Sequence, residues 1–191
     1  SSDVCSSDLS YGRNVTGAQV INGQHLYFDA NGRQVKGGFV TNTDGSRSFY
    51  HWNTGDKLVS TFFTTGHDRW YYADDRGNVV TGAQVINGQK LFFDTDGKQV
   101  KGAFVTNTDG SRSYYHWNTG NKLVSTFFTS GDNNWYYADA KGEVVVGEQT
   151  INGQNLYFDQ TGKQVKGATA TNPDGSISYR SEERRVGKEC R

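Results

Sequence analysis

One motif recurs three times along this chain at a fixed spacing, and that recurrence limits the fold more than any other feature. Its copies are residues 26–37, 91–102 and 156–167, and each begins 65 positions after the one before it. A fixed period of this length is typical of repeat proteins, in which each unit packs mainly on its neighbours. The sequence therefore predicts a repeat architecture without a single central core.

Each 65-residue period contains three smaller units that read as hairpins. In the first unit, an aliphatic run and an aromatic run flank Asn22-Gly23, and this dipeptide favours a two-residue turn because both of its residues tolerate positive φ. The turns of the second and third units are Asp44-Gly45 and Gly66-His67-Asp68. A further glycine follows each hairpin, and the gaps between these glycines are 23, 22, 20, 23, 22 and 20 residues.

No window of the chain shows the apolar spacing of an amphipathic helix. A single hairpin is marginally stable in water, whereas stacked hairpins can share their apolar faces. We therefore expect an all-β fold, an elongated β-solenoid of short stacked hairpins with about 20–23 residues in each unit.

The two ends of the chain do not follow the period. Residues 1–9 and 180–191 match nothing in the repeats, and both resemble translated sequencing adapters. We treat these ends as non-native and expect one repeat module over residues 10–179, itself a fragment of a longer protein. The two cysteines, Cys5 and Cys190, lie in these ends, so we predict no disulfide in the repeats.

Charge and composition exclude several classes of function. The 20 basic and 20 acidic residues give a formal net charge of zero, without the basic stripe that nucleic acids or anionic membranes require. No apolar run approaches the roughly 18 residues of a membrane span. Aromatic residues make up 14% of the chain, which argues against disorder. We expect a monomer with no nucleic-acid partner and no membrane insertion.

Catalysis and metal binding have little support in the sequence. The four histidines are scattered, and no Ser or Asp partner follows from their spacing. Asp29, Asp74 and their copies stand at turn positions, where Asp is favoured for structural reasons. Residues 94–97 match the start of a calcium loop but lack its downstream Glu. We therefore predict no catalytic residue, no metal site and no cofactor.

The combination of an aromatic pair, Asp-x-x-Gly and Gln-Val-Lys-Gly resembles the glucan-binding repeats, also called cell-wall-binding repeats. These occur in lactic acid bacterial glucansucrases and in streptococcal glucan-binding proteins, and the resemblance covers residues 10–179. Residues 70–82 are also similar to the choline-binding repeats of pneumococcal surface proteins. In that family a Trp usually follows the closing glycine and completes an aromatic cage, whereas Ala18, Ala83 and Glu148 stand there in this chain.

The resemblance implies one sugar-binding pocket in each period, built from a stacking Tyr and a Gln-x-Lys pair. A pyranose ring stacks its C–H face on an aromatic ring, and its hydroxyls need fixed donors and acceptors. Because Gln34 and Lys36 are two apart, both point to one face of an extended segment. The implied residues are Tyr27, Gln34 and Lys36, then Phe92, Gln99 and Lys101, then Tyr157, Gln164 and Lys166, with Tyr50 and Tyr115 as candidate second walls.

The three pockets are not expected to be equal. Phe92 can stack on a sugar but cannot donate a hydrogen bond, so the second pocket should be weaker. The third pocket should be incomplete, because residues 168–170 depart from the repeat and an Arg replaces the aromatic residue at position 180.

The resemblance thus implies a non-catalytic module that binds dextran-like α-glucan. Its parent would be a larger secreted, extracellular glucansucrase or glucan-binding protein, with attachment to the cell surface as a further option. Two alternatives stay open: an anchor that recognises choline or another cell-wall polymer, and a structural spacer with every aromatic ring buried. Exposure of Tyr27 and its copies separates binding from the spacer. Of the tryptophans, we expect Trp70 and Trp135 to belong to the core, while Trp52 and Trp117 fit either role.

Overall fold

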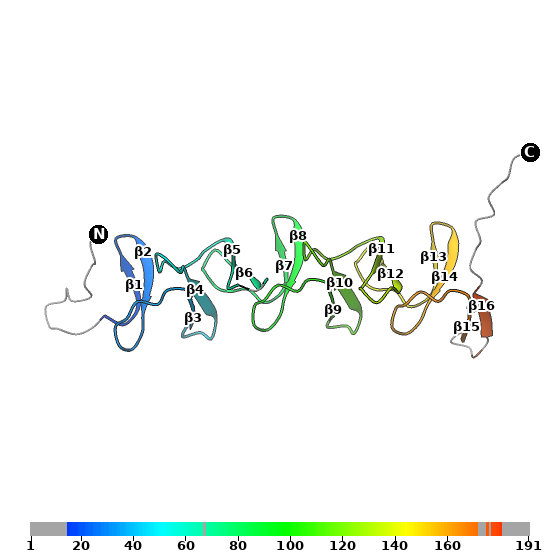
Figure 1. Ribbon diagram of the computed structural model, residues 1–191, viewed down its shortest axis with the longest axis horizontal. Helices are drawn as coiled ribbons and strands as arrows, with labels where there is room; N and C mark the ends of the chain where they lie inside the picture. The colour runs from blue at the N-terminus through cyan, green and yellow to red at the C-terminus, as the bar shows by residue number, and fades with distance from the viewer. Residues whose placement is uncertain (1–14, 67, 172–174, 176, 181–191) are drawn as a thin grey trace, which may run out of the picture. The chain divides into compact units, whose positions relative to one another are not determined.

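The computed structural model describes residues 15–66, 68–171, 175 and 177–180. In this part of the chain sixteen strands pair two by two into eight antiparallel hairpins, and no helix is present (Figure 1). The strands are β1 Gly17–Ile21, β2 Gln24–Phe28, β3 Gly38–Thr41, β4 Arg47–Tyr50, β5 Thr61–Thr64, β6 Trp70–Ala73, β7 Gly82–Ile86, β8 Gln89–Phe93, β9 Ala103–Thr106, β10 Arg112–Tyr115, β11 Thr126–Thr129, β12 Trp135–Ala138, β13 Gly147–Ile151, β14 Gln154–Phe158, β15 Ala168–Thr171 and β16 Ile177–Arg180. The predicted all-β fold of repeated hairpins is confirmed.

By its contacts the chain divides into two compact units, Ser1–Val85 with Phe92–Gln99 and Ile86–Leu91 with Val100–Arg191. The predicted adapter-like ends lie outside the described residues, apart from Arg180, whose backbone pairs with Ala168. Cys5 and Cys190 also lie outside them. The assignment of these ends as non-native stays a prediction.

The first hairpin of each period closes through the turn that its sequence predicts. Asn22, Asn87 and Asn152 each have a φ of 51°, and the glycine after each also has positive φ. Two consecutive positive φ values are characteristic of a type I′ turn, whose twist matches that of the flanking strands. In β1–β2 this turn places Ile21 opposite Gln24.

The loop after a hairpin forms a backbone hydrogen bond with the preceding hairpin. Lys57, after β4, forms a bridge with Tyr50 of its own hairpin, and its backbone N–H donates to the carbonyl oxygen of His25 in the preceding hairpin at 2.8 Å. Equivalent bonds of 2.7–2.8 Å run from Val79 to Arg47, Gln99 to Trp70, Lys122 to Lys90, Val144 to Arg112 and Gln164 to Trp135. Within each unit, hairpins therefore stack through backbone hydrogen bonds as well as side chains.

Each unit has its own aromatic core. In the first unit, the buried ring of Phe63 stacks on Phe49 at 4.6 Å and on Tyr71 at 5.3 Å between centroids. In the second unit, Phe128 is stacked in the same way on Tyr114 and Tyr136. The two cores are copies of one arrangement, as the period of the sequence predicts.

The Asp residues of the Asp-x-x-Gly turns serve the backbone. The Oδ1 atom of Asp29 accepts hydrogen bonds from the backbone N–H groups of Asn31 and Arg33 at 2.8 and 2.9 Å. In the segment that resembles a calcium loop, Asp94 accepts in the same way from Asp96 and Lys98. The equivalent bonds recur at Asp74, Asp139 and Asp159. These carboxylates hold turns closed, in agreement with the structural role that their position predicts.

Candidate functional site

The aromatic part of the first predicted pocket lies where hairpin β1–β2 meets hairpin β3–β4, within one unit. The rings of Tyr27 in β2 and Tyr50 in β4 have their centroids 5.8 Å apart and are tilted by 48°. Tyr27 is half-buried, whereas Tyr50 is almost fully buried. Burial, and to a lesser degree the neighbouring Tyr27, raises the pKa of the Tyr50 hydroxyl. Tyr27 thus presents part of its ring to solvent, and Tyr50 supports it from the protein side.

The polar part of this pocket is the loop after β2. The Nε2 atom of Gln34 donates to the carbonyl oxygen of Thr54 at 3.1 Å. A Cβ atom placed on Gly55 would overlap the Gln34 amide and would lie 3.2 Å from Cγ of Lys36. Both side chains therefore lie over the same glycine, as their spacing predicts, and the exposed Lys36 reaches solvent.

Backbone hydrogen bonds fix this loop at both ends. The N–H of Val35 donates to the carbonyl oxygen of Tyr27 at 2.8 Å, and the N–H of Gly37 donates to that of Tyr50 at 2.9 Å. The structure therefore brings Tyr27 and Tyr50 together as one pair and Gln34 and Lys36 as another, with the backbone of their loop bonded to both tyrosine strands. The grouping of all four side chains into one pocket stays a prediction.

In the third period, Trp135 lies beside two residues of the predicted pocket, although sequence reasoning did not group it with them. The N–H of Gln164 donates to the carbonyl oxygen of Trp135 at 2.7 Å, and Nζ of Lys166 lies 5.8 Å from the centroid of the Trp135 ring. Tyr157 is buried in β14. The side chain at position 180 lies outside the described residues, so the expected incompleteness of this pocket stays a prediction.

The residues of the second predicted pocket belong to different units. Phe92 is half-buried and Gln99 is buried in one unit, while Lys101 is half-buried and Tyr115 is buried in the other. The backbone of Gln99 bonds to Trp70 in its own unit. Their grouping into one pocket stays a prediction.

The expectation that Trp70 and Trp135 are core residues is wrong. They are 37% and 46% exposed, whereas the residues that follow them, Tyr71 and Tyr136, are buried. Successive side chains of a strand point to opposite faces, so one Trp-Tyr pair cannot enter one core. The alternation was predictable from the sequence, but the sequence did not indicate which of the two faces is buried.

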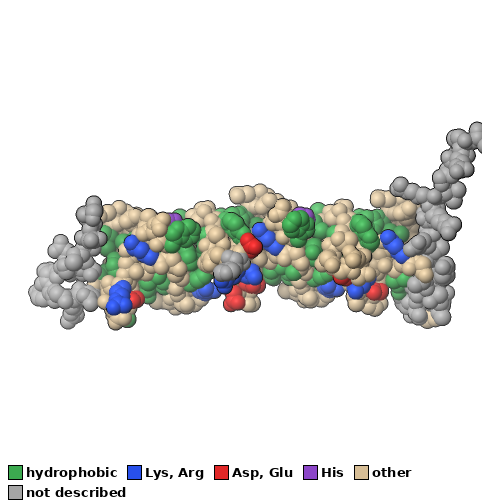
Figure 2. Space-filling model, in the orientation of Figure 1, with side chains coloured by type: hydrophobic (Ala, Val, Ile, Leu, Met, Phe, Trp, Pro, Cys, Tyr) green, Lys and Arg blue, Asp and Glu red, His purple; other side chains and the backbone are tan. Residues whose placement is uncertain are grey.

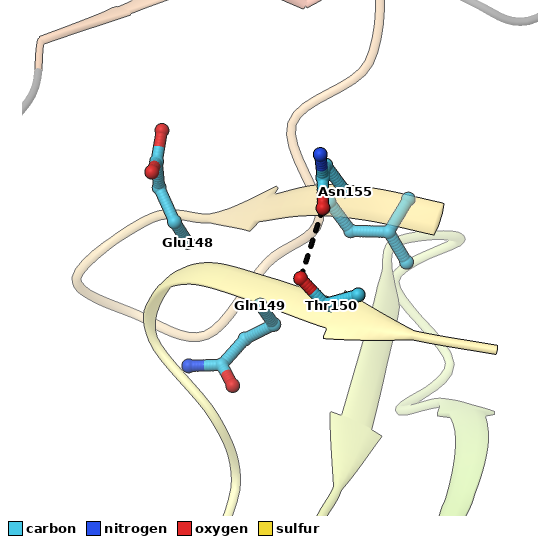
Figure 3. A pocket seen from close by; sticks show the side chains of 5 residues that line it. Glu148, Gln149, Thr150 and Asn155 are labelled. Carbon is cyan, nitrogen blue, oxygen red and sulfur yellow. Dashed lines mark hydrogen bonds between the residues drawn. The ribbon is translucent and has the colours of Figure 1, made fainter. Parts of the chain in front are cut away.

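A shallow hollow of about 210 Å³ lies on hairpin β13–β14 (Figure 3). Glu148, Gln149, Thr150, Asn155 and Leu156 line it, and Oγ1 of Thr150 donates to Oδ1 of Asn155 at 2.9 Å. None of the predicted sugar-binding residues lines this hollow. Its single carboxylate does not supply the pair that glycoside hydrolysis uses.

The surface carries no concentration of one charge on the face drawn in Figure 2, where hydrophobic side chains reach solvent beside Lys and Arg side chains. Among the described residues, no group of three His, Cys, Asp or Glu side chains is placed to hold a metal ion. Nor does this part of the chain contain a helix with the length and apolar character of a membrane span.

Hairpins that stack through a loop bonded to the preceding hairpin match a known class of repeat. The choline-binding repeat profile matches residues 15–62, 80–127 and 145–183, and a cell wall binding repeat profile matches residues 125–144. The chain therefore belongs to the choline-binding repeat family, in agreement with the resemblance seen in its sequence.

The chain is also similar to curated relatives, and its fold matches solved structures. The chain is 49% identical to Glucosyltransferase-I and 43% identical to Glucosyltransferase-S of Streptococcus mutans serotype c, over 86% of this chain and 11% of each relative. It therefore spans a small part of the length of these relatives. Its fold matches choline-binding protein F of Streptococcus pneumoniae with a TM-score of 0.65, at 19% identity over 86% of this chain and 57% of that one. CbpJ of Streptococcus pneumoniae TIGR4 matches with a TM-score of 0.67, at 17% identity over 84% of this chain and 57% of that one.

Proposed function

We propose that this chain is a non-catalytic carbohydrate-binding module for dextran-like α-glucan. The observation that carries the proposal is the loop after β2, where Gln34 and the exposed Lys36 lie over Gly55 and the backbone is bonded to the strand of the partly exposed Tyr27. An aromatic face next to fixed polar groups is the combination that a pyranose ring needs. The identity to two proteins named glucosyltransferases supports glucan as the polymer.

The module would be part of a larger secreted protein, a glucansucrase or a glucan-binding protein. The relatives are much longer than this chain, which leaves room in them for a separate catalytic domain. The protein would act outside the cell, as a monomer and either free or attached to the cell surface. Several weak pockets on one chain would then bind one polymer. Each bound segment presents the next segment at high effective concentration, so affinity would arise from avidity.

A second candidate function is a cell-wall anchor that binds choline, which the family match favours. Two observations weigh against it. Ala18 lies opposite Tyr27 in β1–β2, where the family usually has the Trp that completes an aromatic cage. Aromatic cages bind a quaternary ammonium as a cation, and the ammonium of Lys36, in the loop after β2, would also repel such a ligand. The spacer alternative requires buried rings. The partial exposure of Tyr27 and Phe92 disagrees with it, whereas the buried Tyr157 agrees with it.

Native electrophoresis of the full chain under reducing conditions, in gels with and without dextran, tests this proposal. We expect dextran to retard the chain relative to a non-binding protein of similar size. In a parallel experiment we expect no retention on a choline resin. Retention on choline without retardation by dextran would instead support the anchor, and a folded chain that does neither would support the spacer.

A further inference from the structure

Trp52 and Trp117 stand at equivalent positions of the two units and are 49% and 70% exposed. The neighbouring rings of Tyr50 and Tyr115, two residues earlier in each copy, are buried. Leaving a large indole ring in water gives up the stabilisation that burial would provide. A ring with one apolar face and one polar N–H group is also a frequent component of binding surfaces. The repeated exposure of this ring therefore calls for a reason other than packing.

A histidine precedes each exposed indole, and in the first unit its ring stacks on the indole. The rings of His51 and Trp52 are stacked with centroids 4.6 Å apart and an interplanar angle of 27°. The Nδ1 atom of His51 accepts from the backbone N–H groups of Asn53 and Thr54 at 3.3 and 3.4 Å, which fixes the imidazole in the turn. In the second unit, His116 makes the equivalent bonds, and its ring lies 5.7 Å from that of Trp117. One face of the Trp52 indole is therefore covered by the imidazole of His51.

Trp52 also lies directly beside the Gln-x-Lys loop of the first pocket. A Cβ atom placed on Gly37, the residue after Lys36, would lie 3.3 Å from Cβ of Trp52. On its other side this loop is bonded to the strand of Tyr27 through Val35. The loop that carries Gln34 and Lys36 is therefore bonded to the backbone of Tyr27 and packs beside Trp52.

The same contact recurs in the other unit. A Cβ atom placed on Gly102 would lie 3.3 Å from Cβ of Trp117, and the N–H of Gly102 donates to the carbonyl oxygen of Tyr115 at 2.9 Å. Both glycines have positive φ, which a residue with a side chain rarely adopts. The close approach of the tryptophan to the loop is thus built into both copies.

We propose that Trp52 is a stacking platform for a second glucose unit, next to the unit bound at the loop of Gln34 and Lys36, and that Trp117 is the equivalent platform within the other unit. This inference rests on the proposed glucan binding and deepens it, because it makes the first pocket a site for at least two consecutive sugars. The C–H face of a pyranose stacks on the indole, while Lys36 donates to hydroxyls between the two rings. Because a second sugar would stack on the indole, binding should strengthen from glucose to short α-glucan oligosaccharides.

The test is Trp52→Ala combined with Trp117→Ala in the full chain, measured by electrophoresis at several dextran concentrations. We expect the apparent dissociation constant to rise about tenfold, since stacking on both rings is lost. Trp52→Phe with Trp117→Phe keeps an aromatic face and should retain most of the affinity. Val20→Ala with Val85→Ala is the matched control, because these residues are also exposed and apolar and stand at equivalent positions of the first two periods. It should leave retardation unchanged.

Thermal unfolding separates a lost contact from a lost fold. The exposure of both indoles predicts a small change in the thermal midpoint, and binding is measured below the midpoint of every variant. If dextran retards wild type and the alanine pair equally, the platform is overturned while the proposed glucan binding stands. If dextran does not retard wild type, glucan binding itself fails, and the platform fails with it.

Discussion

Phe63→Ala should lower the free energy of unfolding of its unit by about 3–5 kcal/mol. Phe63 is buried between the stacked rings of Phe49 and Tyr71, so its removal leaves a cavity lined by aromatic groups that cannot all move inward. Urea and thermal denaturation followed by circular dichroism measure the loss. Phe128→Ala should give a similar loss in the other unit, where the same stack recurs.

The control is Phe62→Ala in the same strand. Phe62 is half-buried on the opposite face of β5, where it pairs with Tyr72 at 4.8 Å between centroids. Its removal exposes the partner ring to solvent and should cost clearly less than removal of Phe63. Equal losses for Phe62 and Phe63 would contradict the assignment of the core to one face of the hairpin.

Gly77→Ala should destabilise the chain more than Gly45→Ala, although both glycines adopt the left-handed conformation. Their φ values are 78° and 84°, and a side chain there costs about 1–2 kcal/mol in either position. At Gly45 a Cβ atom meets nothing within 4 Å. At Gly77 it would lie 2.9 Å from the carbonyl oxygen of Leu58 and would overlap the side chain of Lys57. Overpacking of this kind adds roughly 1–3 kcal/mol.

The comparison of these two glycines uses the same denaturation experiments. The difference between the two variants isolates the steric contact, because the backbone conformation is nearly the same in both. If both variants lose the same free energy of unfolding, the close contact between the turn after β6 and the loop after β4 does not contribute to stability as the structure indicates. The glycine spacing in the sequence would then reflect backbone conformation alone.

The fold was largely predictable from the sequence because its signals are local and repeated. An Asn-Gly turn needs two positive φ values, and Asn22-Gly23 adopts them. The Asp at the start of each Asp-x-x-Gly turn caps its own backbone, as at Asp29. These features depend on a few neighbouring residues, so no knowledge of distant contacts was needed to expect them.

The sequence predicted that Gln34 and Lys36 share one face of a loop, but not how far the candidate site residues are exposed. The spacing of Gln34 and Lys36 placed both on one face, yet the bond from Gln34 to Thr54 depends on where the next hairpin turns. The burial of Tyr50 depends on its packing against Tyr27. In β6 both faces carry aromatic rings, so the sequence could not show that Tyr71 enters the core while Trp70 faces outward. Each of these properties arises between hairpins.

The most direct test of the proposed glucan site is dextran electrophoresis of a variant with its first and third pockets removed. Tyr27→Ala and Lys36→Ala are combined with Tyr157→Ala and Lys166→Ala in the full chain. The control combines Val85→Ala and Lys90→Ala, which removes an exposed apolar side chain and an exposed lysine outside the predicted pockets. We predict that the four substitutions abolish most of the retardation and that the control keeps it. Full retardation of a folded four-substitution variant would contradict binding at the Tyr and Gln-x-Lys pockets.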